Sequence, residues 1–162
     1  MDVRLIFGLS ALMSMVSGSI LAGLYVWPWL RARARDQALA VLVAPHMLIR
    51  LLGLSFLVSG VVSPALPSAF AVPAAYGDLT AGVLAIVATI ALAKHALWAG
   101  AAVWVFNILG SADLLYAFYG GGHAHLQPGS LGAAFYLPTA MVPLLLVSHF
   151  LIFGLLLRRE QT

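Results

Sequence analysis

Four long stretches without a single charged side chain constrain this protein more than any other feature. They cover residues 5–30, 51–77, 96–112 and 114–157. The hydrocarbon core of a bilayer requires about 20 consecutive apolar helical residues, and three of these stretches exceed that length. Hydrophobic residues make up 63% of the chain and charged residues 8%, which leaves too little polar surface for a water-soluble domain. The sequence therefore predicts an all-α, multi-pass membrane bundle whose backbone groups are satisfied within helices.

We expect five transmembrane helices in one domain. The expected windows are residues 5–27, 45–66, 77–97, 99–119 and 134–157. The second helix has two alternative starts: near Asp36 with a kink at Pro45, or at Pro45 itself, since proline suits a first helical turn. We favour the later start, because residues 47–66 already span a bilayer. The early start would bury Arg50 about 20 Å deep, whereas the late start leaves it near the headgroups.

Charge alternates between the expected connections. Arg31, Arg33 and Arg35 follow the first window and Lys94 lies at the turn between the third and fourth helices, whereas the second and fourth connections carry no charged residue. The positive-inside rule then predicts an external N-terminus, a cytoplasmic C-terminus and a bacterial inner membrane as the location. We expect the net charge of +3 to meet anionic lipid headgroups, so the basic balance does not indicate a nucleic-acid partner.

A strip of small residues predicts how the first helix packs. Ser10, Ser14, Gly18 and Ala22 follow one another at four-residue spacing, so they lie along one helix face. Small residues let a second backbone approach closely. We expect this face to contact another helix of the bundle, a different membrane subunit or a second copy of the chain.

Polar side chains within the apolar windows are costly and invite a functional interpretation. The candidates are His46, Arg50, Asn107, Asp113 and His149. With the early start of the second helix, the two histidines lie at matched depth, where they could bind a haem b iron or simply bond to neighbouring helices. The arginine and the aspartate form the one plausible buried ion pair, which could hold two helices in register or bind a headgroup or quinone oxygen. The asparagine is expected to donate an interhelical hydrogen bond.

A second group of candidates lies in or near the external connections. His123 and His125 stand two residues apart in a glycine-rich segment, and Asp78 is the nearest external carboxylate in sequence. Together they would suit a transition metal such as Zn²⁺ or Cu²⁺. The alternatives are a solvated loop for the histidines and an N-terminal helix cap for the aspartate.

Several segments resemble known membrane proteins. Residues 49–60, beginning Ile49-Arg50-Leu51-Leu52-Gly53, resemble the first helix of DoxX-like proteins, and residues 70–88 resemble their second helix. The spaced residues Trp104, Asn107, Gly110 and Asp113, and the segment from Pro143 to His149, resemble patterns in uncharacterised bacterial multi-pass proteins. The DoxX-like resemblance covers residues 47–92. It implies a four-helix core preceded by one extra span, in a group that includes small subunits of quinone-linked oxidoreductases.

The functional expectation is a non-catalytic subunit or scaffold of a membrane complex, with a quinone-dependent redox system as one context. Cysteine is absent, which excludes disulfides, thiolate metal sites and iron–sulfur clusters. The chain carries no paired-carboxylate motif, no Gly-x-Ser-x-Gly, no P-loop and no HExxH. Two alternatives remain: a haem- or quinone-binding electron-transfer protein, and a small lipid- or metabolite-binding protein or transporter. A cavity lined by Arg50, Asn107 and Asp113 would favour the last of these.

Overall fold

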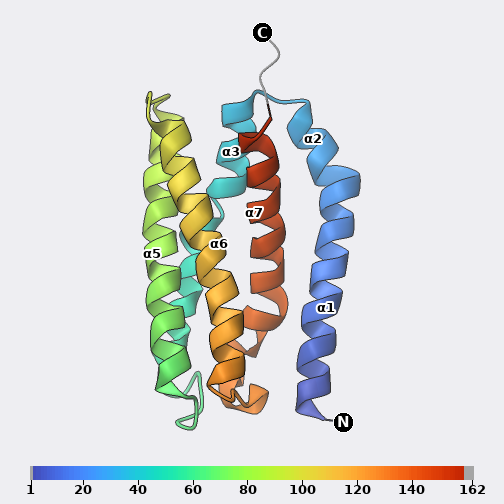
Figure 1. Ribbon diagram of the computed structural model, residues 1–162, viewed down its shortest axis with the longest axis vertical. Helices are drawn as coiled ribbons and strands as arrows, with labels where there is room; N and C mark the ends of the chain where they lie inside the picture. The colour runs from blue at the N-terminus through green and yellow to red at the C-terminus, as the bar shows by residue number, and fades with distance from the viewer. Residues whose placement is uncertain (1, 159–162) are drawn as a thin grey trace.

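The computed structural model describes residues 2–158, and five long helical segments stand side by side in it (Figure 1). Each segment is long and apolar enough to cross a membrane. They are Val3–Arg31, Arg35–Leu57, Ser68–Ala93, Ala99–His123 and Leu137–Leu156. The expectation of an all-α, multi-pass bundle is therefore confirmed.

Three of the segments are built from shorter elements. The first comprises α1 (Val3–Leu21), the wide π-helical turn η1 (Ala22–Val26) and α2 (Trp27–Arg31). The second comprises α3 (Arg35–Val43), α4 (His46–Ile49) and the 3₁₀ segment η2 (Arg50–Leu57). The third and fourth are the continuous helices α5 (Ser68–Ala93) and α6 (Ala99–His123). The fifth is entered through η3 (Pro128–Phe135) and comprises η4 (Leu137–Met141) and α7 (Val142–Leu156).

The favoured start of the second helix, at Pro45, is wrong. The segment begins at Arg35 and passes through Pro45, around which tight turns join the N–H of Met47 to the carbonyl of Ala44 at 3.1 Å. A proline cannot donate a backbone hydrogen bond, and these turns accommodate the missing donor. The segment ends at Leu57, because Val58 is extended and Gly60 has a left-handed φ of 89°. Arg50 consequently lies in the middle of the bundle.

The expected start of the third helix, near residue 77, is also wrong. Helix α5 begins at Ser68, directly after the extended Pro67, and continues through Pro73. Membrane helices tolerate such a proline because neighbouring groups satisfy the freed carbonyl. Asp78 therefore lies ten residues after Ser68, inside the helix, and does not cap its N-terminus.

The expected external end of the fourth helix is too early. Helix α6 continues to His123, four residues beyond the expected end, so the glycine-rich residues 120–122 are helical. Asp113 accordingly lies ten residues before the end of α6, about 15 Å along the helix axis. The fifth helix is instead shorter than expected at this end, because it begins at Leu137, after η3, and not at residue 134.

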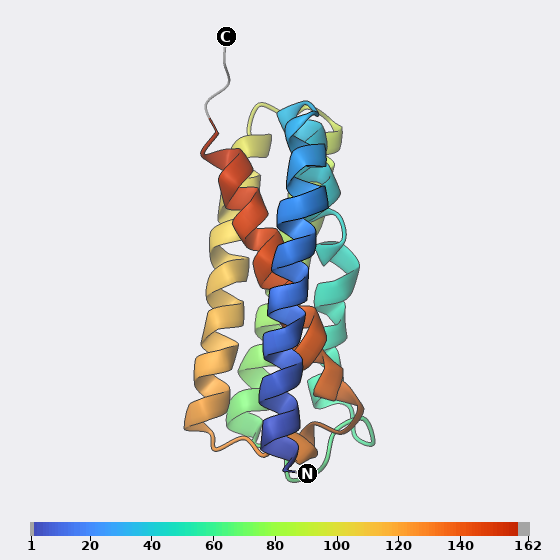
Figure 2. The ribbon, with the colours of Figure 1, turned by 90° about the vertical axis from the view of Figure 1, so that its right-hand side faces the viewer.

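The small-residue strip on α1 packs within the bundle. Gly18 and Ala22 are buried, and a Cβ atom added at Gly18 would come within 2.7 Å of Leu144 and 3.7 Å of Val147, both on α7. Figure 2 shows α1 crossing α7. The predicted packing role of this strip is therefore confirmed, with α7 as its partner.

Cationic residues gather at the end of the bundle where the described chain finishes, uppermost in Figure 1. Arg33 stacks 3.5 Å from the centre of the Trp29 ring, and Arg35 Nη2 donates to the Leu156 carbonyl at 2.8 Å. Below them lies a closely packed apolar core from all five segments, in which Leu30, Val43 and other members are fully buried. This end of the bundle is tied together by both charge and packing.

At the opposite end, two connections pair with each other. The N–H of Ser63 donates to the Ser130 carbonyl and the N–H of Ala133 to the Val61 carbonyl, each at 2.9 Å. Gly132 has a φ of 53°, and a Cβ atom there would overlap the Val61 carbonyl. Glycine is thus required at this close approach. The pairing holds the residues after η2 against η3.

Candidate functional site

Arg50 is the centre of a polar cluster inside the bundle. It is fully buried, and its Nη1 donates to Asp78 Oδ1 and to Asp113 Oδ2, each at 2.7 Å. Its Nη2 donates to the Gly110 carbonyl at 2.6 Å and to His149 Nε2 at 3.0 Å. Four of the five guanidinium hydrogens are therefore used on groups from α5, α6 and α7. One side chain from η2 ties these three helices together.

The bond from Arg50 also determines the tautomer of His149. Because the arginine can only donate, His149 Nε2 must accept, and its proton therefore resides on Nδ1. That nitrogen donates to Asn107 Oδ1 at 2.7 Å, and Asn107 Nδ2 donates to the His149 carbonyl at 3.2 Å. Asn107 thus makes two hydrogen bonds from α6 to α7, which confirms the expected interhelical bond.

His46 extends the cluster toward the cationic end of the bundle. Its Nε2 lies 2.8 Å from Ser148 Oγ, and its ring centre lies 4.7 Å from that of His149. Phe106 packs against both imidazoles, with ring centres 5.0 and 5.2 Å away. Both histidines are buried, as the early start of the second helix implied.

Three glycines make room for the cluster. A Cβ atom at Gly53 would overlap the Asp78 carboxylate, and one at Gly77 would overlap Asp113 Oδ1. A Cβ atom at Gly110 would lie 2.8 Å from the His149 ring and 3.2 Å from Arg50 Nη2. The charged groups therefore approach the backbones of η2, α5 and α6 at positions where no side chain stands between them.

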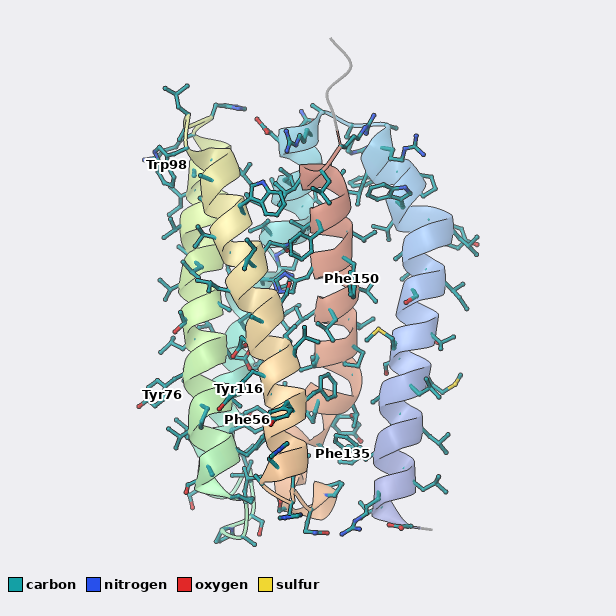
Figure 3. All side chains as sticks on the ribbon, in the orientation of Figure 1. Phe56, Tyr76, Trp98, Tyr116, Phe135 and Phe150 are labelled. Carbon is teal, nitrogen blue, oxygen red and sulfur yellow. The ribbon has the colours of Figure 1, made fainter. Side chains whose placement is uncertain are left out.

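A cavity of about 290 Å³ lies beside the two carboxylates, toward the end of the bundle where the N-terminus lies. All five segments contribute to its lining. Its aromatic walls come from four separate elements and comprise Phe7, Phe56, Phe70 and Phe118. Figure 3 labels Phe56 in the lower half of the bundle. The charged residues of the lining are Asp78, Asp113 and Arg4.

The cavity only partly matches the one that would favour a lipid- or metabolite-binding protein. Asp113 lines it, whereas Arg50 and Asn107 are fully buried behind the carboxylates and do not. The predicted ion pair between Arg50 and Asp113 is confirmed. Sequence reasoning missed that Asp78 is the second partner of this arginine. Ten residues of helix precede Asp78. The sequence instead predicted a helix start at Gly77-Asp78, because a glycine followed by an aspartate is typical of a helix start.

The histidines have hydrogen-bonding roles in this geometry. A haem iron between His46 and His149 would need one nitrogen of each ring to face it across a porphyrin, yet the two rings are in contact. His149 Nε2 faces Arg50 and His46 Nε2 faces Ser148. The arrangement fits interhelical bonding better than axial ligation.

The suggested external metal ligands are not brought together. Asp78 bonds to Arg50, while His123 Nδ1 lies 3.3 Å from the Tyr119 carbonyl at the end of α6. His125 lies beyond that helix with a φ of 49°. Within residues 2–158 no three His, Asp or Glu side chains are grouped closely enough to hold a metal ion.

Comparison with protein families places the chain. Residues 6–157 match the family described as Domain of unknown function (DUF8737), and the chain belongs to that family. No curated protein and no solved structure matches the sequence significantly. Functional inference therefore depends on the geometry of the cluster and the cavity.

Proposed function

We propose that this member of the DUF8737 family is a membrane protein that binds a small amphipathic molecule in the cavity between its five helices. The observation that carries the proposal is a cavity with two carboxylates at its inner end and aromatic walls. Ligand sites are commonly apolar hollows of about 300–1,000 Å³ with a few fixed polar groups. At about 290 Å³, this cavity suits a molecule with a single ring or a comparable short apolar body.

The rigidity of the carboxylates supports a binding role. Each is held by a charge-assisted hydrogen bond from Arg50, and Gly53 and Gly77 are packed against them. Polar groups fixed before a ligand arrives lose little entropy when they bind it. A purely structural ion pair would need only one carboxylate, whereas here a second one faces the same cavity.

The orientation of the protein belongs to the same proposal. Arg31, Arg33, Arg35 and Lys94 lie at one end of the bundle, and the positive-inside rule assigns that end to the cytoplasm. The cavity then opens in the external half of the membrane. A bacterial inner membrane is the proposed location, and the ligand would reach the site from the external side or from the lipid.

The binding proposal can be tested with three single-ring probes that differ in their polar group: benzylamine, benzyl alcohol and benzoate. Ala117→Phe fills the cavity from α6, while Ala112→Phe adds the same ring to an exposed position of that helix as a matched control. Saturation-transfer NMR on protein in lipid nanodiscs should detect the amine or the alcohol bound to wild type and to the control variant, and not to Ala117→Phe. Equal signals from all three proteins would show that the probes bind lipid only.

A second candidate function is a non-catalytic subunit of a larger membrane complex, including a quinone-linked one. The peripheral position of the first segment favours it, because 11% of its 18-residue apolar window is buried, compared with 28–44% for the windows of the other four segments. Lipid tails would also cover this surface. Crosslinking from Leu12 on the exposed face of α1 separates the two, since a specific subunit gives a discrete protein adduct.

A further inference from the structure

The charges around the inner end of the cavity indicate what class of ligand it takes. We propose that the site binds an organic monocation, such as a protonated amine or a quaternary ammonium, between Asp78 and Asp113. This inference rests on the proposed binding function and specifies its ligand.

The first argument is charge balance. With both aspartates ionised, Arg50 contributes one positive charge and its two partners two negative charges, so the ion cluster has a formal charge of −1. Each carboxylate uses one oxygen on Arg50 Nη1. The second oxygens, Asp78 Oδ2 beside Gly53 and Asp113 Oδ1 beside Gly77, make no hydrogen bond within residues 2–158. The two side chains remain 15% and 16% exposed, and both residues line the cavity. A bound cation would neutralise a charge that is costly in a medium of low dielectric.

The second argument is that the cluster presents no donor to an anion in the cavity, because the one guanidinium hydrogen without a partner within residues 2–158, on Arg50 Nε, is buried away from it. Arg50 Nη1 is occupied by the two carboxylates, and Nη2 by the Gly110 carbonyl and His149. The guanidinium is fully buried and does not reach the cavity. An anionic ligand would therefore meet two carboxylates without a compensating charge, and like charges at short range repel it.

The aromatic walls supply a third, independent argument. Phe56 and Phe70 form an edge-to-face pair with ring centres 5.4 Å apart, and Phe7 and Phe118 complete the walls from α1 and α6. The faces of such rings attract cations, most strongly where water is excluded. A neutral ligand would gain only apolar contact from them.

Arg4 is the remaining charged group in the lining. It is exposed and donates to Gln127 Oε1 at 2.9 Å. Solvent screens a charge at this position, whereas the buried carboxylates are screened much less. The cation therefore binds at the inner end of the cavity, away from Arg4.

A pair of probes with the same shape tests the inference. Benzyltrimethylammonium and neopentylbenzene differ in one atom, the quaternary nitrogen or carbon, and therefore in charge. Affinity for full-length protein in nanodiscs is measured by titration. The titration signal of Ala117→Phe is subtracted from that of wild type, because it reports only partitioning of the probe into lipid. We expect the cation to bind wild type about tenfold more tightly than its neutral counterpart, the ratio that 1.4 kcal/mol represents.

Two variants locate the source of this preference. Asp113→Asn keeps an oxygen that can accept from Arg50 Nη1 but brings the formal charge of the cluster to zero, so the preference for the cation should disappear. Phe70→Leu keeps the charge and removes one ring, so the preference should fall several-fold while neopentylbenzene binds much as before. A variant that fails to fold leaves the other informative.

The outcomes separate this inference from the proposed function. If the two probes bind wild type equally, or if benzyl alcohol binds while benzyltrimethylammonium does not, the cavity is a binding site but the cation assignment is wrong. If none of the probes discriminates wild type from Ala117→Phe, both proposals are wrong. A cation preference that survives Asp113→Asn and Phe70→Leu would also overturn the inference.

Discussion

The two ends of the bundle are built in different ways. The cationic end has a continuous apolar core in which Val103, Phe106 and Ile152 are fully buried. The opposite end has a smaller buried cluster around Phe70, Ala75 and Leu131 and also holds the cavity, and a layer of charged groups around Arg50 lies between the two ends. In a membrane, helix association depends on packing and hydrogen bonds, because lipid tails are as apolar as leucine. A solid half can therefore hold the helices together while the other half retains space for a ligand.

The strongest test of this division is removal of the layer between the two ends. Arg50→Met leaves Asp78 and Asp113 close together without their cation, and breaking a buried ion pair in this way costs about 3–5 kcal/mol. Reversible unfolding in mixed micelles, followed by circular dichroism, measures this loss. Arg4→Met, which removes an exposed cation, should change stability by less than about 0.5 kcal/mol. Similar losses in the two variants would mean that the cluster does not hold the bundle.

Matched leucines compare the two ends directly. Leu155 in the packed core and Leu114 beside the cavity are both 1% exposed. Leu155→Ala should cost about 2 kcal/mol, near the low end of the range for core leucines because burial from lipid adds little. Leu114→Ala should cost about 1 kcal/mol less, because the space that it opens joins the neighbouring cavity, which a lipid chain can enter, so that less contact is lost. Unfolding of both variants in the same micelles checks the order, and a larger loss at Leu114 would contradict the division.

Close packing around the charged layer has a smaller expected effect. Gly110→Ala places a methyl group 2.8 Å from the His149 ring, and the resulting shift should cost about 1–2 kcal/mol. Gly100→Ala on the same helix adds a methyl group where nothing lies within 4 Å, and should be neutral or stabilising by about 0.4–1 kcal/mol. Thermal unfolding in detergent compares the pair. Equal midpoints would show that the layer can relax around the added group.

Much of the fold was predictable because long apolar stretches indicate directly which segments lie in the lipid bilayer. The number of spans and the grouping of cationic connections follow from charge-free stretches that water could not accommodate. Helix ends were less predictable. Residues 68–76 are as apolar as a membrane helix but contain Pro73, and hydropathy cannot distinguish an apolar loop from a helix that tolerates a proline.

The candidate site also has a part that the sequence predicted and a part that it did not. Arg50, Asp113 and Asn107 were identifiable because each polar group inside an apolar stretch needs a partner, and few partners exist. The role of Asp78 was not predicted, because it depends on where α5 begins, and the sequence pattern did not indicate that helix start. The cavity was not predicted for a different reason. It is the space between five helices, so no single segment of the sequence encodes it.

Asn107 gives the finest test, because it joins α6 to α7 through two hydrogen bonds beside the charged layer. Asn107→Ala removes the acceptor of His149 Nδ1 and the donor to the His149 carbonyl. Interhelical hydrogen bonds in membranes contribute about 0.6 kcal/mol on average and about 1.7 kcal/mol at most, so we expect a loss near 1 kcal/mol. Nitrogen NMR of the imidazole separates this role from simple packing. Without the asparagine, the Nδ1 proton of His149 should exchange faster, while Nε2 still accepts from Arg50. An unchanged exchange rate would mean that Arg50 alone orients the ring, and the ion cluster would then be independent of the contacts between α6 and α7 around it.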